Sequence, residues 1–180
     1  MISETELIHL IRNARHEWLN ELQVIKGYLT LNQLDNAEGI IEGLIMKSRN
    51  EAKLSNQDIP LLSALVLTFN WYQHTFKLDL EVTGEGFRLS VYDRQLASLL
   101  QNMLHVFDEH ASNRTENTMA LLIHIMDTSA CLTLDFTGQL NYPEQIEQFV
   151  EVEKEELNQS IHLVEHYIKT NEAVITFEIN

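Results

Sequence analysis

The sequence is short of positive charge, and this shortage argues against two kinds of partner. Only 12 residues are Lys or Arg, against 27 that are Asp or Glu, so the formal net charge is -15. Affinity for nucleic acids and for acidic membrane surfaces comes mainly from basic side chains that neutralise phosphates. We therefore expect no nucleic-acid partner and no membrane partner.

The chain also lacks long apolar runs and has a single cysteine. No stretch approaches about 18 uninterrupted apolar residues, and the opening MISETELIHL has neither the basic start nor the cleavage site of a signal peptide. We therefore expect a cytoplasmic protein. Cys131 alone excludes an internal disulfide, and its apolar neighbours indicate a strand core rather than a reactive thiol. The histidines show no spacing typical of zinc ligands, so no metal site is predicted.

The N-terminal part of the sequence carries a long amphipathic pattern. From Glu4 to about Leu31, apolar residues recur at steps of three and four, which predicts one helix. Its apolar seam consists of Leu7, Ile11, Ala14, Trp18, Leu22, Ile25 and Leu29. After a turn over residues 32–36 the same spacing continues to about Lys53, so a second helix is predicted antiparallel to the first.

Two helices alone do not enclose a core. Burying a dozen aliphatic side chains contributes roughly 1.5 to 3 kcal/mol each, whereas ordering about fifty residues costs roughly 1.5 kcal/mol apiece. The hairpin therefore needs a partner surface, and its coiled-coil-like seam favours a second copy of the same hairpin. We predict a homodimer held together by a four-helix bundle.

The polar, proline-containing stretch 54–60 ends the helical pattern and predicts a domain boundary. We assign residues 1–54 to the helical hairpin and residues 55–180 to an α/β domain. The elements predicted in the second domain are a helix over 61–76, a strand over 77–82, a helix over 93–111, paired strands over 118–126 and 131–137, a broken helix over 142–169 and a strand over 174–179. The predicted fold class is α+β, a helical hairpin followed by an α/β sandwich.

His16 lies on the polar face of the first predicted helix. At about 100° per residue it falls about 160° from Trp18, the centre of the apolar seam, and so points to solvent. The residues that share this face, and that we predict to bind a partner, are Arg12, Asn13, Asn20, Gln23 and Gly27. His9 lies on the same stripe, so exposure alone does not distinguish a functional histidine from a solvated one.

An exposed histidine suits phosphoryl transfer. A neutral imidazole nitrogen attacks phosphorus, and the ordinary pKa of histidine, about 6.5, leaves much of it neutral at cytoplasmic pH. Glu17 is expected to accept a hydrogen bond from the other ring nitrogen or to handle its proton, and Arg15 and Arg12 to steady the phosphoryl oxygens. Because the reaction depends mainly on positioning and charge, the metal ion and the donor aspartate can belong to the other protein.

The segment from Arg15 to Gly27 follows the pattern R-H-[DE]-x-x-N-x-L-Q-x-I-x-G. It resembles the phosphoacceptor helix of the sporulation phosphotransferase B family and of the related sensor kinases for dicarboxylates. The similarity continues through residues 51–56, 67–71 and 92–93 and covers essentially the whole chain, more loosely toward the C-terminus. It implies that His16 is phosphorylated within a dimeric four-helix bundle. It also implies a single-domain response regulator as donor, and as acceptor the regulator that controls entry into sporulation.

The second domain resembles a histidine-kinase ATPase domain with degenerate nucleotide boxes. Residues 96–107 are similar to the helix that carries two asparagines facing nucleotide and magnesium, but Val106 stands at the second position. Residues 133–138 keep only a remnant of the Asp-x-Gly-x-Gly box, and residues 160–168 resemble the helix after the last glycine box, without its glycines. Because those glycines let backbone approach phosphates, we expect no nucleotide cofactor and no autokinase activity. Magnesium is expected only from the partner regulator.

The sequence therefore predicts a phosphorelay phosphotransferase that controls the initiation of sporulation. His16 would take a phosphoryl group from the aspartyl phosphate of one response regulator and pass it to an aspartate of another. A non-catalytic dimeric adaptor that docks regulators and a divergent sensor histidine kinase are the alternatives. The pattern His16-Glu17-x-x-Asn20 is also similar to the motif that bifunctional kinases use to dephosphorylate regulators. His162 and His166, four apart on a predicted helix, are interpreted as a surface pair rather than metal ligands.

Overall fold

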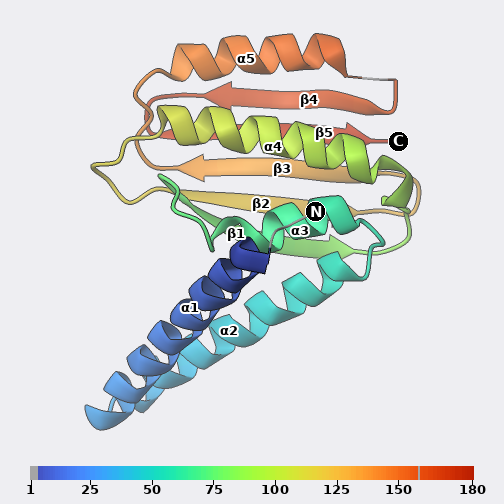
Figure 1. Ribbon diagram of the computed structural model, residues 1–180. Coiled ribbons are helices and arrows are strands. Elements are labelled where there is room, and N and C mark those ends of the chain that lie inside the picture. The colour runs from blue at the N-terminus through green and yellow to red at the C-terminus, as the bar shows by residue number, and fades with distance from the viewer. Residues whose placement is uncertain (1–3, 158) are drawn as a thin grey trace.

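A helical hairpin projects from an α/β layer in the computed structural model, which describes residues 4–157 and 159–180 (Figure 1). The hairpin consists of α1 (Glu4–Thr30) and α2 (Leu34–Ser55). The layer contains, in chain order, α3 (Pro60–Phe69), β1 (Lys77–Gly84), the short helix η1 (Ser90–Tyr92), α4 (Asp93–His110), β2 (Thr118–Ile125), β3 (Ala130–Thr137), α5 (Pro143–Glu156), β4 (Ile161–Ile168) and β5 (Glu172–Ile179). The predicted α+β class is confirmed. Within the described ranges, no helix combines the length and the apolarity needed to cross a membrane.

The turn between α1 and α2 has a local cause. Asn32 adopts a positive φ of 56°, a left-handed conformation that asparagine tolerates better than most residues. The amide of Gln33 then donates a hydrogen bond to the carbonyl of Tyr28, and the amide of Asn32 donates one to the carbonyl of Leu29. This pair of bonds is a Schellman motif, which satisfies carbonyls in the last turn of α1. The turn lies where the sequence predicts it, although α2 already begins at Leu34.

The α/β layer is built on a five-stranded sheet in the order β1-β2-β3-β5-β4. β1 and β2 are parallel, and the other neighbouring strands are antiparallel. The helices α3, α4 and α5 lie across one face of this sheet (Figure 1). Alternate residues of β2, β3 and β5 are buried, while those between them are mostly half-buried. The core is packed around Phe107 of α4, Phe136 of β3 and Phe177 of β5, all fully buried.

β1 is an edge strand whose free side is closed by side chains instead of another strand. Asn70 accepts a hydrogen bond from the amide of Leu78 at 2.9 Å and donates one to the carbonyl of Leu78 at 2.7 Å. Further along β1, the amide of Val82 donates to Asn50 of α2 at 3.2 Å, and its carbonyl accepts from Lys53 of α2 at 2.9 Å. Because the polar groups of a strand edge need partners, these bonds hold α2 against the sheet.

The helix predicted over 61–76 ends at Phe69. Beyond it, Asp108 of α4 accepts hydrogen bonds from the amide and the hydroxyl of Thr75, both at 2.7 Å. The same carboxylate lies 2.7 Å from a ring nitrogen of His74. At the end of α3 the amides of Trp71 and Tyr72 donate to carbonyls only three residues back, those of Thr68 and Phe69. The α-helical pattern of bonds to the fourth residue back therefore stops there, and Asp108 fixes the connection to β1.

The largest departure from the prediction lies in residues 142–169, which were expected to form a broken helix. α5 ends at Glu156, and residues 161–168 form β4, which pairs with β5. The resemblance of residues 160–168 to a helix is therefore wrong. The register shifts by one residue between Leu163 and Glu165, so Val164 forms a β-bulge. The bulge breaks the strict alternation of apolar residues along β4, and the remaining spacing imitates that of a helix.

The bulge also separates the two histidines that were expected to share a helix face. His162 is exposed, whereas His166 is half-buried and lies 3.4 Å from Glu151 of α5. They therefore point to opposite faces of β4. Cys131 lies on β3, as a strand residue should, but it is half-buried on the sheet face away from the helices rather than in the core. Burial there, and the nearby charge of Glu178, raise the pKa of the Cys131 thiol.

We expect Asn70→Ala to destabilise the fold by about 1 to 3 kcal/mol, because it removes both hydrogen bonds to the backbone of Leu78. Chemical denaturation followed by circular dichroism measures the change. Asn113→Ala is the matched control, since Asn113 is an exposed loop residue. Equal free energies of unfolding for the two variants would contradict the role assigned to Asn70.

Candidate functional site

His16 lies near the middle of α1 on the side that points away from α2. Its side chain is exposed and makes no hydrogen bond or ion pair with any other described residue. The predicted residues that are exposed along with it are Arg12, Asn13, Arg15, Asn20, Gln23 and Gly27. His9, one stripe position earlier, is exposed as well. Except for Glu17, the predicted residues therefore lie on the accessible surface of one helix, within reach of a large partner.

Glu17 follows His16 in sequence, but its carboxylate lies between the two helices of the hairpin. It accepts a hydrogen bond from the ammonium group of Lys47 on α2 at 2.9 Å. Glu21, one turn further along α1, lies 3.6 Å from the same nitrogen. Consecutive helical residues point about 100° apart and do not face each other. The hydrogen bond expected between Glu17 and His16 is therefore not among the contacts of the described residues, and Glu17 binds α2 instead.

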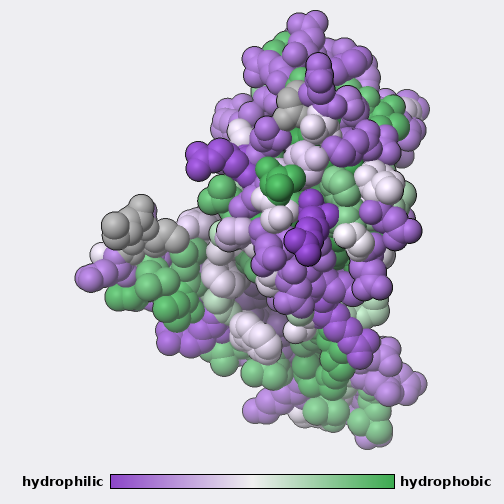
Figure 2. All heavy atoms as spheres, turned by 90° about the vertical axis from the view of Figure 1, so that its right-hand side faces the viewer, coloured by the Kyte–Doolittle hydropathy of each residue, from purple (hydrophilic) through white to green (hydrophobic). Residues whose placement is uncertain are grey.

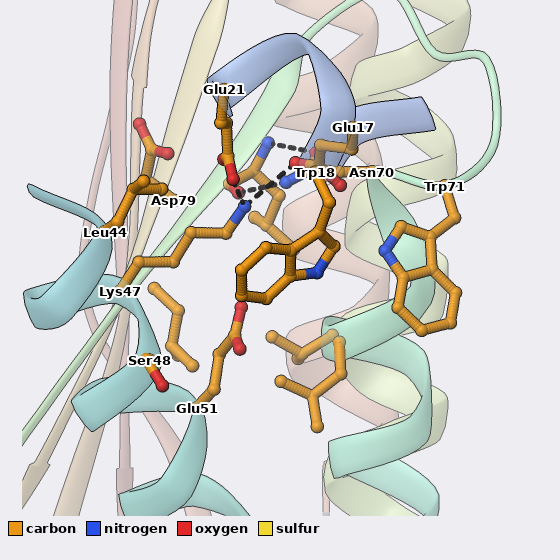
Figure 3. Close-up of a pocket in the computed structure, with 14 residues that line it drawn as sticks. Glu17, Trp18, Glu21, Leu44, Lys47, Ser48, Glu51, Asn70, Trp71 and Asp79 are labelled. Atoms are coloured by element: carbon orange, nitrogen blue, oxygen red, sulfur yellow. Dashed lines mark hydrogen bonds and ion pairs between the residues drawn. The ribbon is translucent and has the colours of Figure 1, made fainter. Parts of the chain in front are cut away.

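Lys47 lies beside an open cavity of about 320 Å³ where the hairpin meets the α/β layer (Figure 3). α1 and α2 form one wall, and residues of α3, β1 and the connection between them form the other. Figure 3 shows Lys47 with the carboxylates of Glu17 and Glu21, and the indole rings of Trp18 and Trp71 to one side of it. The cavity thus adjoins the helix that carries His16 without containing His16.

The charges in this cavity are predominantly negative. Burial disfavours the charged form of Lys47, but the hydrogen bond to Glu17 and the charges of Glu17, Glu21 and Glu51 outweigh burial and raise the pKa of Lys47. Burial also raises the pKa of Glu51. The charge of Lys47 lowers this pKa, but the charges of Glu17 and Glu21 raise it further, and the net shift is upward. Lys47 therefore stays charged and neutralises Glu17 and Glu21, whereas Glu51 is incompletely neutralised.

A second contact joins the same part of α1 to the α/β layer. The side-chain amide of Asn13 donates a hydrogen bond to the carbonyl of Trp71 at 2.7 Å. Trp71 lies just after α3, in the connection held by Asn70 and Asp108. Because Asn13 is one helical turn before His16, this bond restrains the position of His16 relative to the layer. Asn13 was predicted to bind a partner protein, and its amide is already engaged within the chain.

Sequence reasoning missed Lys47, Glu21 and Glu51. Their signal was present as charged residues four apart, at positions 17 and 21 of the first helix and 47 and 51 of the second. These positions flank the apolar seam on the sides where two antiparallel helices meet. Opposite charges there indicate an ion-pair cluster between the helices, but the pairing itself depends on the register of the hairpin.

Much of the apolar seam of α1 is uncovered within one chain. The exposed fractions are 52% for Leu7, 56% for Ile11, 65% for Trp18, 54% for Leu22 and 51% for Leu29. The exposed apolar residues of α2 include Leu34, Ile41, Ile45 and Met46. Figure 2 shows hydrophobic side chains gathered over the hairpin in the lower part of the view, below a mainly hydrophilic α/β layer. A continuous apolar surface of this kind is typical of a protein interface.

The residues that resemble nucleotide boxes are not brought together. Asn102 of α4 donates a hydrogen bond to Glu153 of α5 at 2.8 Å. Val106, one turn further along α4, is buried. Asp135 is half-buried on the face of the sheet away from α4. The sheet therefore lies between the asparagine and the aspartate, and α5 occupies the flank of α4 on which Asn102 lies.

Two family models together match nearly the whole chain. Residues 2–57 match the alpha-helical domain of the SpoOB-type sensor kinases. The hairpin is therefore a domain of this type. Residues 58–180 match the C-terminal domain of sporulation initiation phosphotransferase B. The sporulation initiation phosphotransferase B of Bacillus subtilis strain 168 is 42% identical over 140 residues, which are 77% of this chain and 73% of that protein. The chain belongs to the sporulation initiation phosphotransferase B family.

Solved structures with a similar fold have low sequence identity. The histidine kinase AdeS of Acinetobacter baumannii is 12% identical, with a TM-score of 0.47 over 92% of this chain and 97% of that one. A bacterial phosphotransferase is 15% identical, with a TM-score of 0.42 over 98% of each chain. The histidine kinase ThkA, solved in complex with a response regulator protein, is 15% identical, with a TM-score of 0.40 over 94% of this chain and 60% of that one.

We expect Glu51→Gln to stabilise the protein at neutral pH. The pKa of Glu51 is raised in the folded state. Between the pKa of the unfolded chain and the higher pKa of the folded chain, the folded chain binds more protons, so the stability falls as the pH rises through this range. The substitution removes this loss. Denaturation at about pH 4 and about pH 7.5 should show a gain only at the higher pH. Glu42→Gln, at an exposed position of α2, is the control, and the same gain in both variants would contradict the assignment.

Proposed function

We propose that this chain is a phosphorelay phosphotransferase that carries a phosphoryl group on His16 between two response regulators. The observation that carries the proposal is the exposed, unbonded imidazole of His16 in the middle of α1, inside the sequence pattern of a family named for phosphotransferase activity. By the name of that family, the pathway that it serves is the initiation of sporulation. The protein acts in the cytoplasm, where its regulators are.

The transfer has two steps, from the donor to His16 and from His16 to the acceptor. A ring nitrogen of His16 forms a bond to phosphorus while the bond from phosphorus to the aspartyl oxygen of the donor breaks and releases a carboxylate. The other ring nitrogen keeps its proton or exchanges it with water. In the second step a carboxylate of the acceptor attacks the same phosphorus, and the bond to nitrogen breaks. Since the transition state needs positioning and charge stabilisation, the magnesium ion comes with the acidic pocket of the regulator.

The polar face of α1 suits this docking. Arg12 and Arg15 are exposed near His16 and are proposed to steady phosphoryl oxygens, because guanidinium groups bind such oxygens well. Asn20, Gln23 and Gly27 extend the same surface toward the hairpin turn. A side chain at Gly27 would point into open space, because no atom outside the neighbouring backbone of α1 lies within 4 Å of where its Cβ would be. The surface of a partner can therefore approach the helix closely at this position.

We infer that two chains pair through the exposed seam of the hairpin. The apolar side chains of α1 listed above lie on the opposite side of the helix from His16. Pairing of two hairpins into a four-helix bundle removes this surface from water and leaves the polar faces outside. A dimer of this kind presents two phosphoacceptor histidines on its outer surface.

Phosphotransfer from a labelled phospho-regulator tests the proposal directly. We expect base-stable, acid-labile label on the wild-type chain and none on His16→Gln. His9→Gln is the matched control, since His9 is exposed on the same helix, and it should accept label like the wild type. Label arriving from ATP would make the protein a kinase. Regulator binding without any label on the wild type would make it an adaptor.

Leu22→Glu should convert the dimer into a monomer, because it places a charge in the middle of the exposed seam. Sedimentation velocity gives the mass in solution. Gln23→Glu adds the same charge at the next residue, on the polar face, and should leave the mass unchanged. A wild-type protein that sediments as a monomer at high concentration would refute the four-helix bundle.

A further inference from the structure

The carboxylates of α1 are distributed unevenly around the helix. Between Leu7 and Thr30 the helix has only two, Glu17 and Glu21. Both contact the Lys47 ammonium group, at 2.9 Å and 3.6 Å. Their side chains are only about one-third and one-quarter exposed, at 34% and 25%. The exposed charges of the same stretch are therefore positive, and in a chain of net charge -15 this is an unusual surface.

The carboxylates of Glu17 and Glu21 depend on Lys47 to remain between the two helices of the hairpin, because the other charges around them are negative. Glu51 of α2 and Asp79 of β1 line the same cavity and add negative charge to it. No other lysine or arginine lines the cavity within the described residues. Without Lys47, Glu17 and Glu21 would face each other and Glu51 with no cation between them. Like charges in a partly buried site repel strongly, so the flexible glutamate side chains would turn toward water.

We propose that Lys47 is a positioning residue for the phosphoacceptor face, holding the carboxylates of Glu17 and Glu21 toward the inside of the hairpin so that the surface around His16 presents little negative charge. The consequence for phosphoryl transfer rests on the function proposed above. A phosphorylated aspartate within an acidic pocket is an anionic partner. A Glu17 carboxylate released beside His16 would repel it and lower the rate of productive encounter, and a released Glu21 would add to the negative charge of the same helix.

The first test uses the purified chain alone, so it does not depend on the phosphotransfer proposal. NMR titration follows the His16 ring in the wild type, Glu17→Gln, Lys47→Met and the double variant. If Lys47 sequesters Glu17, Glu17→Gln shifts the titration midpoint of the His16 ring little in the wild-type background. In the Lys47→Met background it shifts the midpoint to lower pH by about 0.5 unit or more, because a nearby carboxylate favours the imidazolium.

Two further variants separate positioning from loss of charge or of folding. Lys47→Arg keeps the ion pair and should titrate like the wild type. Arg49→Met removes one positive charge from an exposed position of the same helix, and Glu17→Gln should have no added effect in that background. Thermal unfolding of each variant identifies any that does not fold. An equal effect of Glu17→Gln with and without Lys47 would overturn the proposal.

The second test measures transfer from a labelled phospho-regulator at several salt concentrations. Lys47→Met should raise the KM several-fold at low ionic strength with little change in kcat, and the difference should shrink as salt screens the charges. Adding Glu17→Gln and Glu21→Gln to Lys47→Met should restore the KM. A fall in kcat that is independent of salt would assign Lys47 a structural role and overturn the proposal. Absence of transfer in the wild type would refute the phosphotransfer proposal and leave the titration result standing.

Discussion

The free edge of β1 is closed by side chains from outside the sheet, and the position of α1, the helix that carries His16, depends on that closure. A strand edge presents amides and carbonyls that need partners. Asn70 supplies one pair of partners at Leu78, and Asn50 with Lys53 supplies another at Val82. Asn50 and Lys53 belong to α2, so the hairpin is attached to the sheet by hydrogen bonds to the backbone of β1. Hydrogen bonds tolerate a smaller range of distances and angles than apolar contacts do, so they fix the position of α2 more closely.

Two sets of contacts connect the α/β layer and α2 to the part of α1 that carries His16. α2 carries Lys47, which binds α1 through Glu17 and Glu21. The connection after α3 carries Trp71, whose carbonyl accepts a hydrogen bond from Asn13. Both routes act on the stretch of α1 from Asn13 to Glu21, which includes His16. Polar contacts on the inner side of α1 therefore help to fix its rotation about its axis, together with the packing of the buried Leu10. This rotation decides which side chains a docking protein meets.

The elements that the sequence predicts well are those whose pattern is local. Apolar spacing in α1 and α2, and the alternation along β2 and β3, repeat over several turns or residue pairs. β4 shows the limit, since a bulge at Val164 replaces alternation with a helix-like spacing. Nothing local marks that bulge, because it exists only in the pairing with β5. The path of the connection after α3 is likewise not local, since Asp108, distant in sequence, accepts a hydrogen bond from the amide of Thr75.

The candidate site likewise contains features that local patterns predict and features that depend on contacts between residues distant in sequence. The exposure of His16 follows from helical periodicity, and the role proposed for it rests on the motif around it. The direction of Glu17 does not, because adjacency in sequence says nothing about which neighbouring helix supplies a cation. The pairing of Glu17 with Lys47 joins residues thirty apart, and it arises only when the hairpin turn at Asn32 sets the register of α2 against α1.

The α/β layer supports the hairpin through contacts to both of its helices. The residues that resemble nucleotide boxes have structural partners or lie apart. Asn102 binds Glu153, Val106 is buried, and Asp135 lies across the sheet. What the layer provides to α1 is a strand edge for α2 and a carbonyl for Asn13. A phosphoryl carrier needs its histidine in a reproducible place when a partner docks, because positioning accounts for much of the rate of transfer. The contacts that hold α1 and α2 therefore give the layer a role in phosphotransfer that needs no nucleotide.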